Sequence, residues 1–390
     1  MKQQQNFSTK LGIIPQGWHI KRLGEICTHF QSGTSITSKQ LKKNGQYPVY
    51  GGNGLRGYTD KYTHDGPYIL IGRQGALCGN INFVENKNFI SEHAIAVQSN
   101  ENMIWLKYKL EYWNLNRFSE SSAQPGLSVK KLARQKLTIP PLPEQQKIAE
   151  IISTWDEAIE KQSQLIEKLE LRKKGLMQQL LNGKKRLPGF YGKWEKVKLG
   201  EICEKVTRKN TEDNKNVMTI SAQRGFVSQT DFFNKSIASK TLESYYLVLK
   251  NEFCYNKSYS NGYPMGAIKR LSEADKAVVT PLYICFNVKS CTYTDINFLS
   301  YYLDNGGLNQ GLTKIANEGG RAHGLLNVTP KDFFNLTLNI PLFVEQTAIA
   351  QVLTTADHEI ELAKQKLELF RQQKHGLMQQ LLTGKKRIKY

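Results

Sequence analysis

Two glycine-rich stretches of this 390-residue chain carry side chains whose chemistry suits the edges of nucleic-acid bases. In "YPVYGGNGLRGY" glycines surround Asn53, Arg56 and Tyr58, and in "LIGRQGA" Arg73 and Gln74 stand between glycines. Glycine lets a backbone approach a duplex closely, an asparagine or glutamine amide matches adenine, and arginine matches guanine or a phosphate. Each stretch also has a purely structural interpretation, because Gly-Asn-Gly is first of all a hairpin turn.

The second half of the chain repeats this mixture of residue types in "SAQRGF" and "YNKSYSNGY". Their amide, cationic and aromatic side chains could contact bases, and their lysines and arginines could hold phosphates without reading sequence. The candidate DNA-binding residues are Asn53, Arg56, Tyr58, Arg73, Gln74, Gln223, Arg224, Asn256, Lys257, Tyr259 and Asn261.

The charge balance favours a polyanionic partner. Lysine and arginine number 54 against 34 acidic residues, which gives a net charge of +20 and a pI near 9.5. Nucleic acid is the first candidate and an anionic membrane surface the second. The N-terminus lacks the apolar core of a signal peptide and nothing resembles a transmembrane span, so we expect a cytoplasmic protein that does not use a membrane.

Sequence motifs for catalysis or metal binding are missing. Gly183-Lys184-Lys185 has lysine where a phosphate loop needs a hydroxyl, and Pro140-Pro141 does not fit the Asn/Asp-Pro-Pro-aromatic motif of adenine methyltransferases. The seven histidines are scattered, and His93 in "SEHAIAV" is typical of a structural strand histidine. Without CxxC pairs a zinc site is not expected, and the cysteines are predicted to be reduced, partly buried thiols. They are Cys27, Cys78, Cys203, Cys254, Cys285 and Cys291.

An internal repeat organises the elements that must position these residues. "WHIKRLGEIC" (18–27) returns as "WEKVKLGEIC" (194–203) at an offset of 176, and "IPPLPEQQKIA" (139–149) returns as "IPLFVEQTAIA" (340–350) at an offset of 201. The second offset persists to the end of "GLMQQLLNGKKR" and "GLMQQLLTGKKR", so the second variable block is 25 residues longer than the first. Repeated scaffold parts therefore enclose two diverged blocks, at roughly 18–139 and 194–340.

The repeated tails are predicted to be long helices. Prolines 140, 141 and 143 precede the first, Gly183 and Gly384 end the two helices, and Glu144 to Asn182 is 39 residues, or about 58 Å. Apolar residues recur every seven positions, as in a coiled coil. The expected seam and partner-binding residues are Ile148, Ile152, Trp155, Ile159, Ile166, Leu169, Leu176, Ile349, Leu353, Ile360, Leu367, Phe370 and Leu377.

Two similar helices from tandem halves most simply pack antiparallel; the alternative is that each covers its own preceding domain. We therefore predict an α+β fold with a pseudo-two-fold tandem repeat, in which two globular domains with β-rich blocks are joined by two long antiparallel helices. The expected segments are a first domain at 1–140, a central helix at 141–186, a second domain at 187–340 and a C-terminal helix at 341–390.

This arrangement resembles the specificity (S) subunit of type I restriction–modification systems. The resemblance covers nearly the whole chain and rests on the repeated "LGEIC", "PLPEQ" and "GLMQQLL" segments together with "YPVYGGNGLRGY" and "GRQGA". Leu342-Phe343-Val344 departs from the family's Pro-Leu-Pro, while Pro341 and Glu345-Gln346 remain.

The resemblance implies a non-catalytic reader of double-stranded DNA, with one target recognition domain for each half of a bipartite site. The helices would fix the spacer and dock two methyltransferase (M) subunits, which methylate adenine with S-adenosylmethionine. Two restriction (R) subunits would use ATP and Mg²⁺, and this chain itself would need no cofactor. An enzyme with a site of dispersed residues and a coiled-coil adaptor whose charge only keeps it soluble are the alternatives.

Overall fold

The computed structural model describes residues 7–9, 12–75, 77–119, 126–229, 242–290, 293–318 and 326–389. Cys291 and His323 lie outside these ranges. The chain divides into two compact units. Unit 1 comprises Met1–Gln164 and Gln365–Tyr390, and unit 2 comprises Leu165–Lys364. Each unit therefore combines a globular domain with parts of both long helices.

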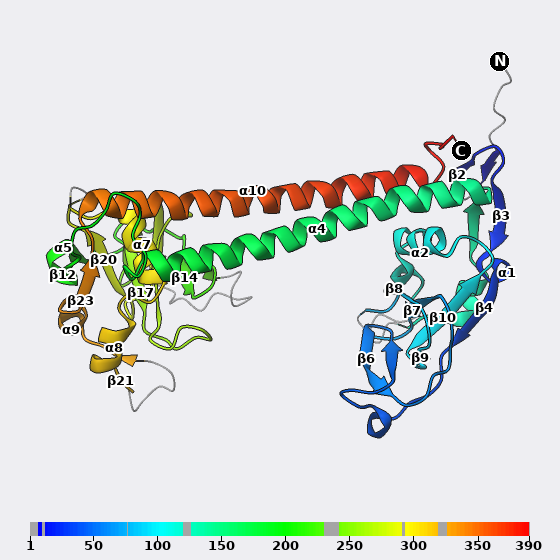
Figure 1. Ribbon diagram of the computed structural model, residues 1–390, viewed down its shortest axis with the longest axis horizontal. Coiled ribbons are helices and arrows are strands. Elements are labelled where there is room, and N and C mark those ends of the chain that lie inside the picture. Colours follow the sequence, from blue (N-terminus) through cyan, green and yellow to red (C-terminus); the bar gives the residue numbers. More distant parts are fainter. Residues whose placement is uncertain are drawn as a thin grey trace, which may run out of the picture. The chain divides into compact units, whose positions relative to one another are not determined.

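A four-stranded antiparallel sheet of order β4-β10-β7-β8 forms the centre of unit 1 (Figure 1). Side chains alternate across it, as they must in a strand. In β10, Ile95 and Val97 join the main core, whereas Ala94 and Ala96 pack in a smaller cluster on the opposite face. The strands are β4 (Cys27–Ser32), β7 (Tyr68–Gly72), β8 (Ile81–Val84) and β10 (Ala94–Ser99).

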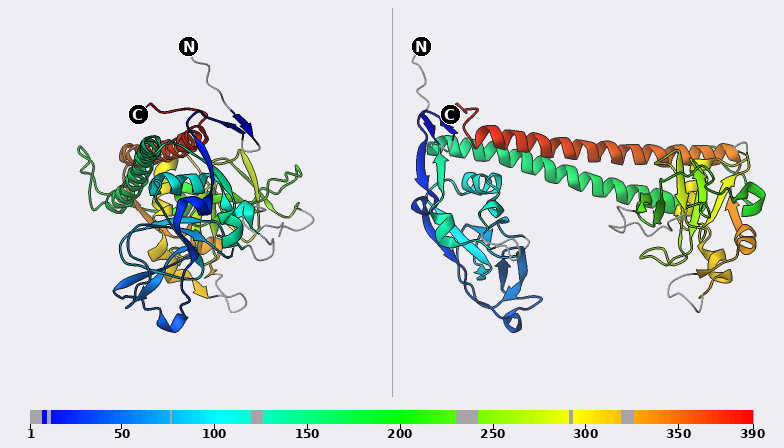
Figure 2. Two further views of the ribbon diagram at one scale, coloured as in Figure 1. Left: turned by 90° about the vertical axis from the view of Figure 1, so that its right-hand side faces the viewer. Right: turned by 180° about the vertical axis from the view of Figure 1, so that it is seen from behind.

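Smaller elements surround this sheet, and Figure 2 shows them from two further sides. β6, β5 and β9 form a second sheet, in which β5 runs parallel to β9, while β11 pairs with β3 and β1 with β2. The bounds are β1 (Phe7–Thr9), β2 (Gly12–Ile14), β3 (His19–Arg22), β5 (Tyr47–Gly51), β6 (Gly54–Thr59), β9 (Phe89–Ile90), β11 (Lys136–Ile139), α1 (Leu23–Ile26), α2 (Met103–Tyr112) and α3 (Val129–Ala133), with 3-10 turns η1 (Ser38–Gln40) and η2 (Leu115–Phe118).

Unit 2 repeats the scaffold of unit 1. Its central antiparallel sheet has the order β13-β20-β17-β18, and β12 pairs with β23 as β3 pairs with β11. The bounds are β12 (Glu195–Lys198), β13 (Cys203–Val206), β14 (Met218–Ser221), β15 (Gly225–Ser228), β16 (Tyr246–Leu249), β17 (Phe253–Asn256), β18 (Ala267–Arg270), β19 (Lys276–Val279), β20 (Ile284–Val288), β21 (Asn317–Glu318), β22 (Leu326–Asn327), β23 (Thr337–Ile340), α5 (Leu199–Ile202), α7 (Ile296–Asp304), α8 (Asn309–Ile315) and α9 (Pro330–Phe334). Each diverged block thus has its own central sheet, and the two sheets have the same order of strands. The α+β prediction is confirmed.

The two long helices are α4 (Leu142–Leu180) and α10 (Phe343–Leu381), each of 39 residues. The helix α4 starts two residues before the expected Glu144 because proline is accepted in a first turn, where no intrahelical partner exists for its missing N–H. Thirty-nine residues correspond to about 58 Å. The expected length of the first helix is correct, and its two ends lie two residues earlier in the chain than expected.

The helices pack antiparallel within each unit (Figure 1). In unit 1 the early α4 meets the late α10, where the Trp155 and Phe370 rings lie edge to face at 5.6 Å and Asp156 pairs with Lys374 at 2.6 Å. In unit 2 the order is reversed, and Lys173 pairs with Asp357 at 2.5 Å. The antiparallel arrangement that the repeat predicts is therefore present.

Burial along the expected seam is graded. Ile148, Ile152, Ile166, Ile349, Leu353 and Ile360 are buried, while Trp155, Ile159, Leu169, Leu176, Leu367, Phe370 and Leu377 are half-buried. The first turns of each helix also cover the domain that precedes it, since Ile148 and Ile152 belong to the core of unit 1 and Ile349 and Leu353 to that of unit 2. Both packing alternatives considered for the helices thus occur, at different positions along them.

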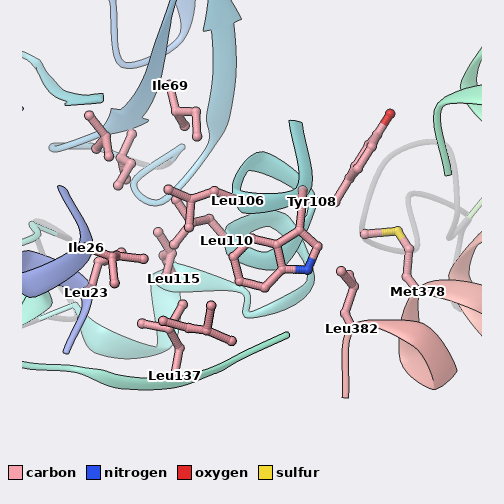
Figure 3. Close-up of a cluster of buried hydrophobic side chains, with 14 of the residues drawn as sticks. Leu23, Ile26, Ile69, Leu106, Tyr108, Leu110, Leu115, Leu137, Met378 and Leu382 are labelled. Carbon is pink, nitrogen blue, oxygen red and sulfur yellow. The ribbon is translucent and has the colours of Figure 1, made fainter. Parts of the chain in front are cut away.

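The end of α10 completes the core of unit 1. Figure 3 shows Met378 and Leu382 pointing toward the cluster that holds Leu106 and Leu110 of α2. Beside them, the buried Lys109 donates a hydrogen bond to the Leu382 carbonyl oxygen at 2.6 Å. Leu180 and Leu181 occupy the same place in the core of unit 2.

Each helix ends in a left-handed glycine followed by an arginine that closes the unit. Gly183 and Gly384 have φ of +70° and +73°. Arg387 then donates two hydrogen bonds of 2.8 Å to the buried Glu144 carboxylate, and Arg186 donates two of 2.6 Å to Glu345. The end of each repeated helix is thereby bonded to the start of the other.

Candidate nucleic-acid interface

The first predicted glycine stretch forms a hairpin turn at the rim of unit 1. The strands β5 and β6 close at Gly51 and Gly54, and Asn53 lies exposed in the turn. The register of the β5–β6 pairing shifts between Val49 and Tyr50, so Arg56 has no partner residue in β5. Its side chain is exposed. A bulge of this kind re-aims a side chain out of the sheet. Tyr58 is only half-buried, and its backbone pairs with Lys42.

The second predicted stretch follows β7 and lies directly against this turn. A Cβ atom on Gly52 would stand 3.0 Å from the Gly72 Cα atom and 2.8 Å from the His93 carbonyl oxygen. Glycine is required there because the two loops touch through their backbones. Gln74 is exposed and Arg73 half-buried. The five candidates of the first block therefore come from two stretches that meet at one edge of the domain, with Tyr58 on the flank.

Residues that the sequence did not mark as DNA contacts stand between these two stretches. Among them is His93, which was expected to be a strand histidine and lies in a turn. Ser91, Glu92 and His93 form the turn before β10, and Ser91 and His93 each contact one of the candidate side chains. Asn82 of β8 lies beside Gly54, and its buried Nδ2 bonds to no described residue. A sequence pattern could not find them, because each contact joins strands far apart in the chain.

The candidates of unit 2 also come together from two stretches. Gln223 and Arg224 occupy the turn between β14 and β15, and the Gln223 amide donates to the Asn261 carbonyl oxygen at 3.2 Å. Asn256 ends β17, donates weakly to the Ile220 carbonyl at 3.5 Å, and accepts from the Ser258 N–H at 3.0 Å. The amides of Gln223 and Asn256 thus hold the two loops together.

The other candidates of unit 2 are more accessible. Tyr259 is 63% exposed, and Asn261 and Arg224 are exposed as well. Lys257 is half-buried, and burial lowers the pKa of its ammonium group. Exposed aromatic, amide and guanidinium groups can stack on bases or bond to base edges and phosphates.

A half-buried ion pair lies beside this loop and was missed by the sequence analysis. Lys269 of β18 pairs with Asp304 at the end of α7, and the Tyr263 hydroxyl donates to the same carboxylate at 3.3 Å. The Lys269 ammonium also lies 4.9 Å from the centre of the Tyr263 ring. The aromatic run "YSNGY" was a visible signal for Tyr263, but nothing in the sequence pointed to Asp304.

The described residues hold no group of three or more histidine, cysteine, aspartate or glutamate side chains that could bind a metal ion. Among these residues, no helix combines the length and hydropathy needed to cross a membrane. Cys27, Cys78, Cys203, Cys254 and Cys285 are free thiols, and burial raises the pKa of Cys27 to about 12.

A family profile described as the type I restriction modification DNA specificity domain matches residues 15–171 and again residues 191–370. The chain belongs to the type I restriction–modification specificity family. Each match contains one of the two loop clusters, together with the start of a long helix. Relatives that bear this name are the DNA-recognition subunits of type I restriction enzymes and not the catalytic ones.

Curated relatives agree with this assignment. The specificity subunit of the type I restriction enzyme EcoprrI from Escherichia coli is 40% identical over 142 residues, 35% of this chain and 35% of that protein. The MjaVIII specificity subunit from Methanocaldococcus jannaschii is 25% identical over an alignment of 432 positions, which covers 99% of this chain and 97% of the relative.

Solved structures of specificity subunits share the fold. An S subunit from M. genitalium has a TM-score of 0.56 at 15% identity, over 93% of this chain and 96% of that one. A chain from work on complex assembly in the type I restriction–modification system has a TM-score of 0.57 at 13% identity, over 95% of this chain and 98% of that one. The fold of two recognition domains and long helices is the fold of this family.

Proposed function

We propose that this specificity subunit reads a bipartite site in double-stranded DNA, with one half-site for each loop cluster. The observation that carries the proposal is that each of the two family matches contains one cluster of glycine turns with exposed amide and cationic side chains. The net charge of +20 supplies the attraction to phosphate. We assign the recognition domains to 1–140 and 187–340, and the segments 141–186 and 341–390 contain the long helices α4 and α10. In this proposal the protein acts in the cytoplasm.

The long helices set the spacer between the half-sites and dock two M subunits. What supports this is identity between the repeats at exposed positions that make few contacts within the chain. Gly175 and Gly376 lie inside the helices, and a Cβ atom on either would meet nothing within 4 Å. The amides of Gln178 and Gln379 are exposed in the same turns. An outward glycine within a helix costs stability, and it permits close approach of another chain.

The M subunits bring S-adenosylmethionine and methylate adenine, while R subunits use ATP and Mg²⁺ to cleave unmodified DNA. The specificity subunit itself contributes recognition and needs no cofactor. In this assignment, the half-buried and exposed apolar side chains along α4 and α10 are available to the partners.

Sequencing the methylated sites of cells that carry this chain with its M subunit tests the reading of DNA. We expect one bipartite adenine-containing motif with a fixed spacer. Exchanging residues 30–130 for those of a relative should change one half of the motif only. Changes in both halves would contradict the assignment of one half-site to each domain.

The proposal that the helices set the spacer length has its own test. Four residues inserted into α4 after Leu165 should alter the permitted spacer length and leave both half-sites intact, because about one helical turn is added. An unaltered spacer would refute the role.

The docking proposal is tested by Gly175→Ala with Gly376→Ala. The double variant should unfold at higher temperature, since alanine favours a helix by about 0.5–1 kcal/mol at each site. It should nevertheless assemble less well with M subunits in analytical ultracentrifugation. Wild-type assembly would remove these turns from the proposed docking face.

A further inference from the structure

The turn Ser91–His93 carries no candidate DNA contact of its own, yet it touches both stretches of the first loop cluster. His93 Nδ1 lies 3.2 Å from Gln74 Oε1, and Ser91 Oγ accepts a hydrogen bond of 3.4 Å from Arg56 Nη1. Arg56 lies in β6 and Gln74 in the loop after β7, and one three-residue turn contacts both side chains. Its position therefore bears on how the candidate side chains are presented.

This turn is held rigidly by its backbone. The Ser91 N–H donates a hydrogen bond to the Tyr50 carbonyl oxygen at 2.8 Å, and the Ser91 carbonyl oxygen accepts one from the Ala94 N–H at 3.0 Å. The His93 carbonyl accepts from the Arg73 N–H at 2.9 Å. The turn is thus bonded to the strand before the glycine hairpin and to the loop that carries Gln74, so it fixes both loops in one frame.

Side-chain contacts fix the histidine ring and its partner. Because an amide oxygen only accepts, the Nδ1 of His93 carries the hydrogen that Gln74 Oε1 receives. The Glu92 carboxylate lies 3.4 Å from the opposite ring nitrogen and also accepts from the Ile36 N–H at 3.2 Å. With its oxygen held by His93, Gln74 turns its Nε2 donors away from the histidine.

Arg56 is held by a comparable device. A Cβ atom on Gly51 would lie 2.6 Å from the Arg56 Cδ atom, so the glycine leaves the space in which the arginine side chain lies toward Ser91. Ser91 is fully buried. The single bond to Ser91 leaves further guanidinium donors for an outside acceptor.

We infer that Ser91 and His93 are positioning residues for base recognition, with His93 orienting the Gln74 amide and Ser91 orienting the Arg56 guanidinium toward one half-site. This inference rests on the proposed reading of DNA by the first loop cluster. An amide or guanidinium must be presented in one orientation to distinguish base pairs, since each pair shows its own pattern of donors and acceptors in the major groove. The turn therefore affects discrimination more than affinity.

The test compares the methylation motifs written by the complex of this chain and its M subunit, for the wild type and single variants. Gln74→Ala and Arg56→Ala identify the base pairs that these two side chains read. His93→Ala should lower discrimination about tenfold at the pair affected by Gln74→Ala, and Ser91→Ala at the pair affected by Arg56→Ala. The other half-site should not change.

Conservative variants separate positioning from folding. His93→Asn places an amide N–H near the position of the imidazole Nδ1 and should restore discrimination. His93→Gln has a similar volume but carries its amide farther out, and it should behave like His93→Ala. The exposed His19 of β3 provides the control, since His19→Ala should leave the motif unchanged. Melting temperatures identify any variant that fails to fold, and the pair His93→Asn and His93→Gln then decides the question.

Two results would overturn the inference in different ways. If Gln74→Ala and Arg56→Ala leave the motif intact, the first loop cluster does not read DNA and the proposed interface itself fails. If these two variants relax the motif while the folded His93→Gln and Ser91→Ala variants keep it, the surface reads DNA without help from the turn.

Discussion

At the residue scale, a few buried polar side chains explain why parts of the repeat are preserved. Glu144 and Gln145 are fully buried, as nearly are Glu345 and Gln346. The glutamines accept the first N–H groups of the segments entering α2 and α7, from Asn102 at 2.9 Å and Asp295 at 3.0 Å. The carboxylates of Glu144 and Glu345 accept hydrogen bonds from Arg387 and Arg186, respectively. The short motif Glu-Gln therefore stands at the start of one long helix and bonds to two other segments. Its glutamine bonds to the domain that precedes this helix, and its glutamate bonds to the end of the other long helix.

The pair of Arg387 and Glu144 predicts a specific loss of stability. Glu144 has no exposed surface, so Arg387→Ala leaves a buried carboxylate without its cation and should cost about 3–5 kcal/mol. Urea unfolding of unit 1 measures this loss. The neighbouring Lys385 is exposed, and Lys385→Ala should change stability by less than about 0.5 kcal/mol. Equal effects of the two substitutions would contradict the role of the pair.

Lys109 predicts a dependence of stability on pH. Burial lowers the pKa of this lysine from 10.5 to about 8. Between these values the unfolded chain binds more protons than the folded one, so the free energy of unfolding rises with pH, on the order of 1 kcal/mol per unit. Below about pH 8 both states are protonated and the contribution is constant. Denaturant titrations from pH 7 to 9.5 should show this rise in the wild type and lose it in Lys109→Met.

At the element scale, the two long helices could be predicted because their signals are local and duplicated. Prolines, a seven-residue apolar period and a glycine with a basic end lie within 50 residues, and the second copy repeats them except for two of the three prolines. The order of the central sheets could not be predicted, since β4 pairs with β10, about 70 residues later, and the two diverged blocks share no pattern there. For the same reason the contact of His93 with Gln74 could not be predicted, because the two residues are brought together by the pairing of strands.

The terminal glycines of the helices provide a matched comparison between the repeats. Alanine at Gly183 or Gly384 must adopt a left-handed conformation, which costs about 1–2 kcal/mol. At Gly384 the new Cβ would also lie 2.3 Å from the Pro15 Cγ atom, whereas at Gly183 the nearest atom is a Trp194 ring carbon at 3.4 Å. Thermal unfolding should therefore show a loss for Gly384→Ala larger than that for Gly183→Ala by about 1–3 kcal/mol. Equal losses would argue against the close contact with Pro15.

At the scale of the whole molecule, each unit is assembled from segments that are distant in the sequence. Unit 1 needs the last turns of α10, because Met378, Leu381 and Leu382 belong to its core and Arg387 bonds to Glu144. The domain boundaries expected from the sequence followed the order of segments along the chain. That the C-terminal segment belongs to the first domain became visible only in the side-chain contacts of the folded structure.

Removal of residues 376–390 tests this assembly. The truncation should expose the core beneath α2 and increase amide hydrogen exchange in 103–112 and 142–156 of unit 1. The corresponding segment of unit 2, 296–304, packs against Leu180 and Leu181 within its own core and should keep its protection. Uniform loss of protection in both units would show that they unfold as one.

The hydrogen bond from Arg387 to the Gln16 carbonyl oxygen at 2.7 Å joins residues that are 371 positions apart, so the first is translated long before the second. Unit 2 is complete once residue 364 has left the ribosome, whereas unit 1 must wait for the segment from 365 onward. The domain translated first is therefore the last to acquire its full core. A chain released before residue 365 would have a finished second unit and an open first unit, and one of the two proposed DNA-reading clusters would then lie in the incomplete unit.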